Sequence, residues 1–327
     1  MPDAGDLHIP AVLTTAAVLA QVVRGGFVES VHHGSVAVTN ADGTVLEAIG
    51  DARSPIFPRS SNKPIQALAM VRAGLDLPDE LLALVCASHS GEPFHLDGVR
   101  RILASAGLSE ADLQNTPDRP YSEVERERWI REGLAPTSLA QNCSGKHAGM
   151  LATCVINGWD RATYLDPAHP LQVAMADTLA ELAGEPIAAI AVDGCGAPVM
   201  AVSLAGLATA FARLAAGDPD RPEGRIATAI RRAPAYLGGT GRDVTALIEG
   251  TPGLIAKDGA EAVYAVGLAD GRGIALKIAD GGQRARPVVL GAVLRRLGVE
   301  STAYEVLAHA PVLGHGQPVG AVLPTDW

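Results

Sequence analysis

Residues 57–68 read FPRSSNKPIQAL and mark the point where strand-like sequence gives way to helical sequence. Pro64 fits the first turn of a helix, because its missing N–H would have no partner there. Ser60 is the predicted N-cap. Ser60 and Lys63 stand three residues apart, so a helix would bring the lysine amine within reach of the hydroxyl. A serine becomes a nucleophile when a base takes its proton, and a desolvated lysine is such a base.

The motif S-x-x-K is short, and its simplest alternative is a capped helix with an exposed lysine. Other parts of the sequence must therefore show whether this motif is catalytic. Upstream, apolar runs and the turn sequence NADG at 40–43 predict strands over 17–23, 27–31, 35–39 and 44–49. Downstream, the turn sequence ADGR at 269–272 predicts a second hairpin.

Helical patterns fill the middle of the chain, including residues 150–156 and 202–216. We therefore expect an α/β (α+β) fold in one catalytic domain over residues 1–327. Its antiparallel sheet would come from about 11–58 and 254–297, with flanking helices and a mostly helical region over about 60–250. The tail from residue 311 is rich in glycine and proline. An active-site cleft should lie where sheet and helical region meet.

Composition excludes several classes of function. The 48% apolar and 19% charged residues indicate a large buried core. A net charge of −10 and 4% aromatic residues argue against nucleic-acid binding. No apolar run reaches membrane-spanning length, and Asp3 and Asp6 precede the run at 11–23, where a signal peptide would carry positive charge. We expect a cytoplasmic protein without a disulfide framework, because the chain has only four cysteines.

Two further stretches follow Ser60-x-x-Lys63 in chain order: Ser88-His89-Ser90 and Lys257-Asp258-Gly259. Penicillin-binding proteins and serine β-lactamases carry S-x-x-K, an S-x-N element and a strand-borne K-T-G in this order. Here the middle element lacks asparagine, and an aspartate replaces the threonine. The serine can instead close a turn and the lysine can lie on the surface, but the shared order favours a serine β-lactamase-like arrangement.

The cysteines fall into two classes. Cys86 and Cys154 lie in apolar runs and are expected in the core. Cys143 and Cys195 lie in polar, glycine-rich loops, and Cys143 is followed by Lys146 and His147. Two thiolates suit a tetrahedral zinc site, although a lysine ligand must first lose its proton. A redox pair and two unconnected loop cysteines are the alternatives.

Five ordered motifs together resemble the rhizobial-type, zinc-containing L-asparaginases. They are RSSNK at 59–63, SHSGE at 88–92, NCSGKH at 142–147, DGCG at 193–196 and AKDG at 256–259. The resemblance runs from about residue 24 to residue 297. It implies a β-lactamase-like fold, hydrolysis of L-asparagine to L-aspartate and ammonia, one Zn²⁺ per chain, and a homodimer. From the composition we expect neither a nucleic-acid nor a membrane partner.

Roles for individual residues also follow from the resemblance. Ser60 would be the nucleophile and Lys63 its base, and Ser88 with Lys257 would form a second Ser–Lys pair, with Ser90 as the alternative to Ser88. The zinc ligands would be Cys143, Lys146 and Cys195. Arg59, His147 and Asp193 would bind the substrate. A β-lactamase- or peptidase-like acyl-transferase, and a non-catalytic amino-acid- or metal-binding protein, remain the competing hypotheses.

Overall fold

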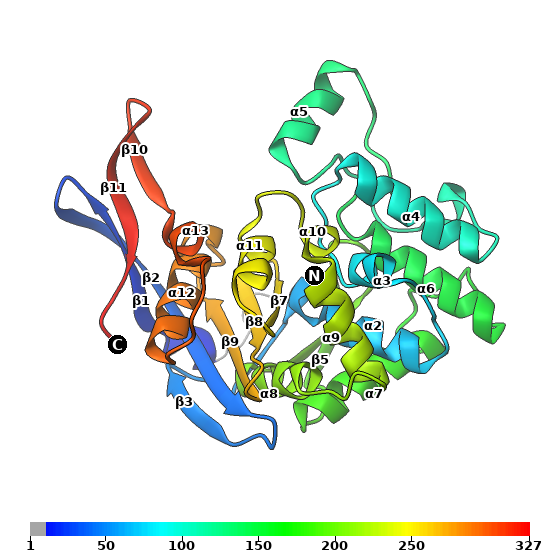
Figure 1. Cartoon of the computed structure of the whole chain (residues 1–327), viewed down its shortest axis with the longest axis horizontal. Helices are drawn as coiled ribbons and strands as arrows, with labels where there is room; N and C mark the ends of the chain where they lie inside the picture. The colour runs from blue at the N-terminus through cyan, green and yellow to red at the C-terminus, as the bar shows by residue number, and fades with distance from the viewer. Residues whose placement is uncertain (1–10) are drawn as a thin grey trace, which may run out of the picture.

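The computed structural model describes residues 11–327, and it confirms a sheet built from both ends of the chain (Figure 1). Asp3 and Asp6, which bear on the signal-peptide prediction, lie outside the described residues. The strands of the sheet are β1 (Ala17–Arg24), β2 (Phe27–Asn40), β3 (Val45–Ile49), β7 (Ile255–Asp258), β8 (Val263–Gly267), β9 (Arg272–Ile278), β10 (Pro311–Gly314) and β11 (Gln317–Pro324).

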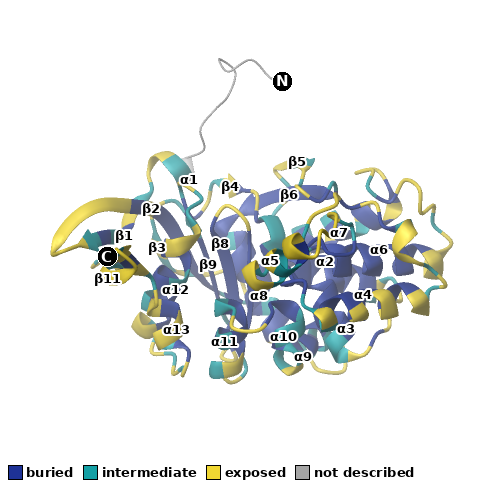
Figure 2. Cartoon of the chain, turned by 90° about the horizontal axis from the view of Figure 1, so that it is seen from above, coloured by how far each residue is buried: buried dark blue, intermediate teal, exposed yellow. Residues whose placement is uncertain are grey.

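All pairings in this sheet are antiparallel, in the order β10-β11-β1-β2-β9-β8-β7, with β3 paired to β2. Its middle strands are buried, whereas the outer end of the β1–β2 hairpin is exposed (Figure 2). Three short strands form a second sheet in the order β4-β6-β5. These are β4 (Pro55–Ile56), β5 (Ala189–Val192) and β6 (Pro198–Ser203).

The predicted helical middle region is confirmed and lies beside the sheet (Figure 1). Its α-helices are α2 (Lys63–Arg72), α3 (Asp79–Val85), α4 (Pro93–Ser105), α5 (Glu123–Arg131), α6 (Ser144–Asn157), α7 (Pro170–Ala183), α8 (Leu204–Ala215), α9 (Pro222–Arg232), α10 (Pro234–Leu237) and α11 (Asp243–Gly250). The ends of the chain add α1 (Ala11–Thr14), α12 (Arg286–Arg296) and α13 (Tyr304–Ala308). No helix in the described part of the chain is long and apolar enough to cross a membrane.

Two glycines allow the helical region to approach the sheet closely. Gly267 and Gly273 face each other across β8 and β9, and α8 packs over both strands. A Cβ atom on Gly267 would overlap the carbonyl oxygen of Phe211, and one on Gly273 would overlap that of Ala208. The backbone of α8 can therefore lie directly on the sheet, because neither strand carries a side chain there.

Several predicted boundaries were wrong. Ser60 does not cap the first long helix: it lies in the 3₁₀ turn η2 (Arg59–Asn62), and α2 begins at Lys63, although Pro64 does occupy its first turn. The segments 27–31 and 35–39 form one continuous strand, because the polar residues between them still pair with β1.

The predicted helix at 202–216 begins two residues late because β6 runs to Ser203. The sheet also extends past the predicted limit at residue 297. The glycine- and proline-rich tail forms β10 and β11, and β11 pairs with β1. At the other end, α1 occupies the first described residues, so the sheet begins only at Ala17.

Candidate active site

The turn that carries Ser60 is held tightly against the end of β7. Ser61 donates from both its hydroxyl and its backbone N–H to the carbonyl oxygen of Pro58, at 2.7 and 3.1 Å. Arg59 has a φ of 52°, which is uncommon for a residue other than glycine. A Cβ atom on Gly259 would lie 2.8 Å from the Pro58 oxygen, so the glycine permits the close approach. Strained backbone of this kind clusters at functional sites.

Ser60 and Ser88 both line a pocket of about 120 Å³. The remaining residues around it are Tyr121, Asn142, Arg242, Asp258, Gly259, Ala260, Gln283 and Arg286. Ser90 has a different environment, because its hydroxyl donates to the carbonyl oxygen of Gly238 at 3.0 Å. The structure thus brings Ser88, and not Ser90, to the same pocket as Ser60.

Lys63 is buried and connects the separate motifs of the sequence. Its amine donates to the Ala87 carbonyl oxygen at 2.6 Å, to the Ser88 hydroxyl at 3.1 Å and to the Cys143 sulfur at 3.0 Å. Among the hydrogen bonds of residues 11–327, none joins Lys63 to the Ser60 hydroxyl. Ser88 lines the pocket and accepts a hydrogen bond from Lys63, so it connects the buried lysine to the pocket.

Lys257 is completely buried at the end of β7. Its amine donates to the backbone oxygen of Asp258 at 2.6 Å and to its carboxylate at 2.5 Å, and forms no hydrogen bond with Ser88 within the described chain. Burial lowers the pKa of Lys257 to about 8, with Lys63 and Arg242 acting in the same direction and Asp258 opposing them. A fraction of this amine is thus neutral near neutral pH and able to accept a proton.

A network of buried charges that the sequence analysis missed surrounds Asp258. Its carboxylate lies 2.5 Å from Arg242 and 3.7 Å from Arg286, which also contacts Asp243 at 3.3 Å. Burial alone would raise the pKa of the Asp258 carboxyl, but Lys257 and the two arginines hold it far below its usual range. Arg242 also donates to the backbone oxygen of Ser88 at 3.0 Å, so this network supports the pocket wall.

The second cluster consists of Cys143, Lys146 and Cys195, and the contact between Cys143 and Lys63 joins it to the first. The Lys146 amine donates to the Cys195 sulfur at 3.2 Å. A hydrogen bond from the Cys143 thiol, together with Lys146, lowers the pKa of Cys195 to about 4 against the effect of burial. The same hydrogen bond and burial raise the pKa of Cys143 to about 12. The opposite directions of the two shifts indicate that Cys195 is the more acidic thiol of the pair.

The three predicted substrate-binding residues adjoin this cluster, but they do not line the pocket of Ser60 and Ser88. Arg59 contacts Asp193 through Nε at 2.8 Å and through a terminal nitrogen at 2.7 Å. Burial would raise the pKa of Asp193, but Lys146 and Arg59 hold it below the usual value.

His147 is fully buried and pairs with a residue that the sequence did not reveal. Its Nδ1 lies 2.7 Å from the hydroxyl of Tyr164, while Nε2 has no hydrogen-bond partner in the described chain. The phenol oxygen also accepts a hydrogen bond from the backbone of Gln114. The Tyr164 hydroxyl can therefore donate to Nδ1, which leaves the proton of a neutral imidazole on Nε2.

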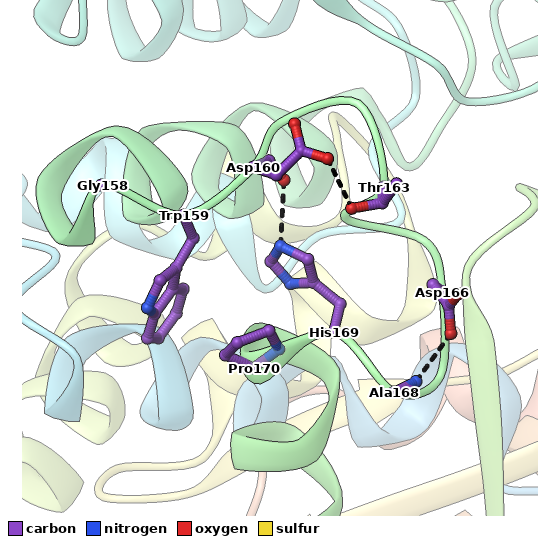
Figure 3. A pocket seen from close by; sticks show the side chains of 8 residues that line it. All are labelled: Gly158, Trp159, Asp160, Thr163, Asp166, Ala168, His169 and Pro170. Atoms are coloured by element: carbon purple, nitrogen blue, oxygen red, sulfur yellow. Dashed lines mark hydrogen bonds between the residues drawn. The ribbon is translucent and has the colours of Figure 1, made fainter.

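A larger cavity of about 510 Å³ lies in the loop over residues 158–170 and contains none of the predicted site residues (Figure 3). Its polar groups serve the loop itself. His169 donates to the Asp160 carbonyl oxygen at 2.9 Å, and Thr163 donates to the Asp160 carboxylate at 2.7 Å (Figure 3). The smaller pocket is lined by two serines, and the buried Lys63 and Lys257 contact its lining residues, so it is the better candidate for chemistry.

Serine hydroxyls in a pocket beside buried lysines are typical of hydrolases that work by acyl transfer. The family model for L-asparaginase II matches residues 20–324, and the chain belongs to this family. The resemblance drawn from the five motifs is thereby confirmed for the family.

Three known structures are similar to the chain at low identity. Native Mglu is 15% identical to this chain, with a TM-score of 0.43, and the match covers 82% of this chain and 64% of Mglu. This chain thus spans less than two thirds of the length of Mglu. A β-lactamase from Mycobacterium bovis is 16% identical over 80% of this chain and 94% of that chain, with a TM-score of 0.45. EstCE1, a hydrolase with promiscuous acyltransferase activity, is 14% identical over 79% and 92% of the two chains, with a TM-score of 0.40. No match was found among proteins of curated function.

Proposed function

We propose that this protein hydrolyses the side-chain amide of L-asparagine to L-aspartate and ammonia, with Ser60 as the nucleophile. The observation that carries the proposal is the shared pocket of Ser60 and Ser88 in a member of the L-asparaginase II family. Its volume of about 120 Å³ lies well below the roughly 300–1,000 Å³ of pockets for drug-sized ligands, which favours a small substrate over a peptide.

In the proposed reaction the Ser60 oxygen attacks the amide carbon and loses its proton to Lys63, directly or by way of Ser88. The C–N bond then breaks, and ammonia leaves with a proton returned from the same base. Water attacks the resulting ester, and aspartate and the free hydroxyl are released. The hydrogen bond between Lys63 and Ser88 supports this route, and the neutral fraction of Lys257 supports its role as a second base.

The test compares Ser60→Ala with Ser61→Ala, which is a matched control because Ser61 is adjacent and donates only to Pro58. Ser60→Ala should release no ammonia from asparagine while the protein stays folded. Ser61→Ala should keep its activity and lose about 1 kcal/mol of stability with its hydrogen bond. Unchanged turnover in folded Ser60→Ala would falsify the assignment of the nucleophile.

We also propose that Cys143, Lys146 and Cys195 hold one zinc ion. No group of three or more histidine, cysteine, aspartate or glutamate side chains suited to a metal occurs in residues 11–327, but this donor set is of another kind. The Lys146 amine and the Cys143 thiol both hydrogen-bond to the Cys195 sulfur, so two sulfurs and one amine meet here. Bound zinc would supply a fixed positive charge, provided that Lys146 gives up its proton.

Metal analysis tests the zinc proposal. Protein prepared without chelator should contain zinc, and Cys143→Ala or Cys195→Ala should lose it. Cys154→Ala is the matched control, because Cys154 is a buried thiol in the apolar core, outside this cluster. Zinc that persists in both site variants, or that is absent from the unaltered protein, contradicts the proposal.

On the basis of the resemblance to the rhizobial-type asparaginases, we further propose a homodimer. Sedimentation velocity over a range of protein concentrations measures this directly. A single species with the mass of one chain at micromolar concentration would refute the proposal.

A further inference from the structure

Arg59, one of the residues predicted to bind the substrate, is already paired with carboxylates of the protein. Arg59 directs two nitrogens to one oxygen of Asp193, and a third lies 3.9 Å from Glu261. Two carboxylates therefore surround this single guanidinium. A substrate carboxylate placed here would have to displace Asp193 or accept its repulsion, at a cost that increases with burial.

The pocket of Ser60 and Ser88 has the opposite balance of charge. Arg242 and Arg286 both line it, and Lys257 lies directly behind. These three cations face two carboxylates, those of Asp258 and Asp243. These charged groups leave an excess of one positive charge at the pocket. A buried excess of positive charge favours an anion in the pocket.

The two guanidinium groups also converge in space. Both lie near the same Asp258 oxygen, at 2.5 Å for Arg242 and 3.7 Å for Arg286. Arg286 donates to the carbonyl oxygen of Gly259 at 3.1 Å and to the side chain of Gln283 at 2.6 Å. Its Nε–H is a buried donor without a partner among residues 11–327. The two guanidinium groups therefore lie at one wall of the pocket, around a single carboxylate.

We propose that Arg242 and Arg286 form the subsite for the α-carboxylate of the substrate, and that Arg59 and Asp193 are a positioning pair for the Ser60 turn. The inference rests on the proposed amidase function and specifies which end of the substrate lies where. The α-carboxylate lies beside Asp258, and the amide carbon lies at the two serines. Amides without a neighbouring carboxylate are consequently poor substrates.

Three substrates and a set of variants test this arrangement. L-Asparagine carries both charged groups, succinamate lacks the α-ammonium group, and 3-aminopropanamide lacks the α-carboxylate. Arg286→Gln and Arg242→Gln should lower kcat/KM for asparagine and succinamate by about 10- to 100-fold, the range of a lost charged hydrogen bond. In both variants the loss should be at least about tenfold greater for asparagine and succinamate than for 3-aminopropanamide, because 3-aminopropanamide has no carboxylate to lose.

Arg59→Gln is the contrasting variant, and it should affect all three substrates alike. Arg72→Gln is the matched control for loss of a paired arginine, because Arg72 binds Glu181 and Glu223 outside the pocket. Equal losses on all three substrates in the Arg286 and Arg242 variants would overturn the proposal. So would a carboxylate-selective loss in Arg59→Gln.

Misfolding of a variant and failure of the proposed function can each be distinguished from failure of the carboxylate subsite. Circular dichroism establishes whether each variant is folded. If Arg286→Gln is not folded, Arg286→Lys takes its place, because lysine keeps the positive charge and lacks the forked geometry of the guanidinium group. If the unaltered protein releases no ammonia from asparagine, the proposed function fails by itself. Calorimetric titration with succinamate then tests the subsite: binding that weakens at least about tenfold in the Arg286 variant supports it, and absent or unchanged binding refutes it.

Discussion

Gly145 allows α6 to pack directly against α3, and replacing it by alanine tests how the second cluster is positioned. A Cβ atom at this position would overlap the carbonyl oxygen of Leu84 and lie 2.9 Å from its Cγ. Backbone atoms cannot rotate away, so the two helices must separate. Gly149, one turn later, is similarly close to Val85, so the contact extends along the helix.

The magnitude follows from two opposing effects. Overpacking of this kind costs about 3 kcal/mol, and the better helix propensity of alanine returns about 1 kcal/mol. Gly145→Ala should therefore lose about 2 kcal/mol of unfolding free energy. Lys146 and His147 follow directly on the same helix, so a displacement near 1 Å should also lower kcat by about 100-fold.

Equilibrium unfolding in urea measures the loss of stability, and ammonia release measures the loss of activity. Gly291→Ala in α12 is the matched control, because its Cβ atom would lie 3.3 Å from the Leu307 Cβ, where small adjustments suffice. It should stay within about 1 kcal/mol of the unaltered protein and keep its activity. The reasoning is refuted if Gly145→Ala is as stable and as active as Gly291→Ala.

Two further predictions concern the serines and the pH dependence. Ser88→Ala should reduce turnover by about 100-fold or more, because proton transfer through its hydroxyl is lost. Ser90→Ala should keep its activity and lose about 1 kcal/mol of unfolding free energy. The reverse pattern in the ammonia assay would assign the role of second serine to Ser90. Because burial lowers the pKa of Lys257 to about 8, its neutral fraction grows as pH rises through that value, and kcat/KM should rise in parallel. A profile that is flat from about pH 6 to 9 contradicts a role for Lys257 as a base.

Local patterns in the sequence were sufficient for the general architecture. Apolar runs and two turn sequences predicted the strands at both ends, since neighbouring residues alone determine such turns. The ordered motifs containing Ser60, Lys63 and Lys257 were visible for the same reason. The tail beyond residue 297 was not recognised as part of the sheet, because its strands are stabilised by pairing with β1, which is about 300 residues away in the chain.

The partners within the site were decided only by the tertiary structure. Nothing in the spacing of Ser60 and Lys63 indicated that the amine would bind Ser88 and Cys143. Arg242 and Arg286 were missed because arginine is usually a surface residue, and only packing shows that these two are buried around one carboxylate. A sequence carries residue types and their spacing, whereas desolvation and charge balance depend on what distant segments bring to the same place.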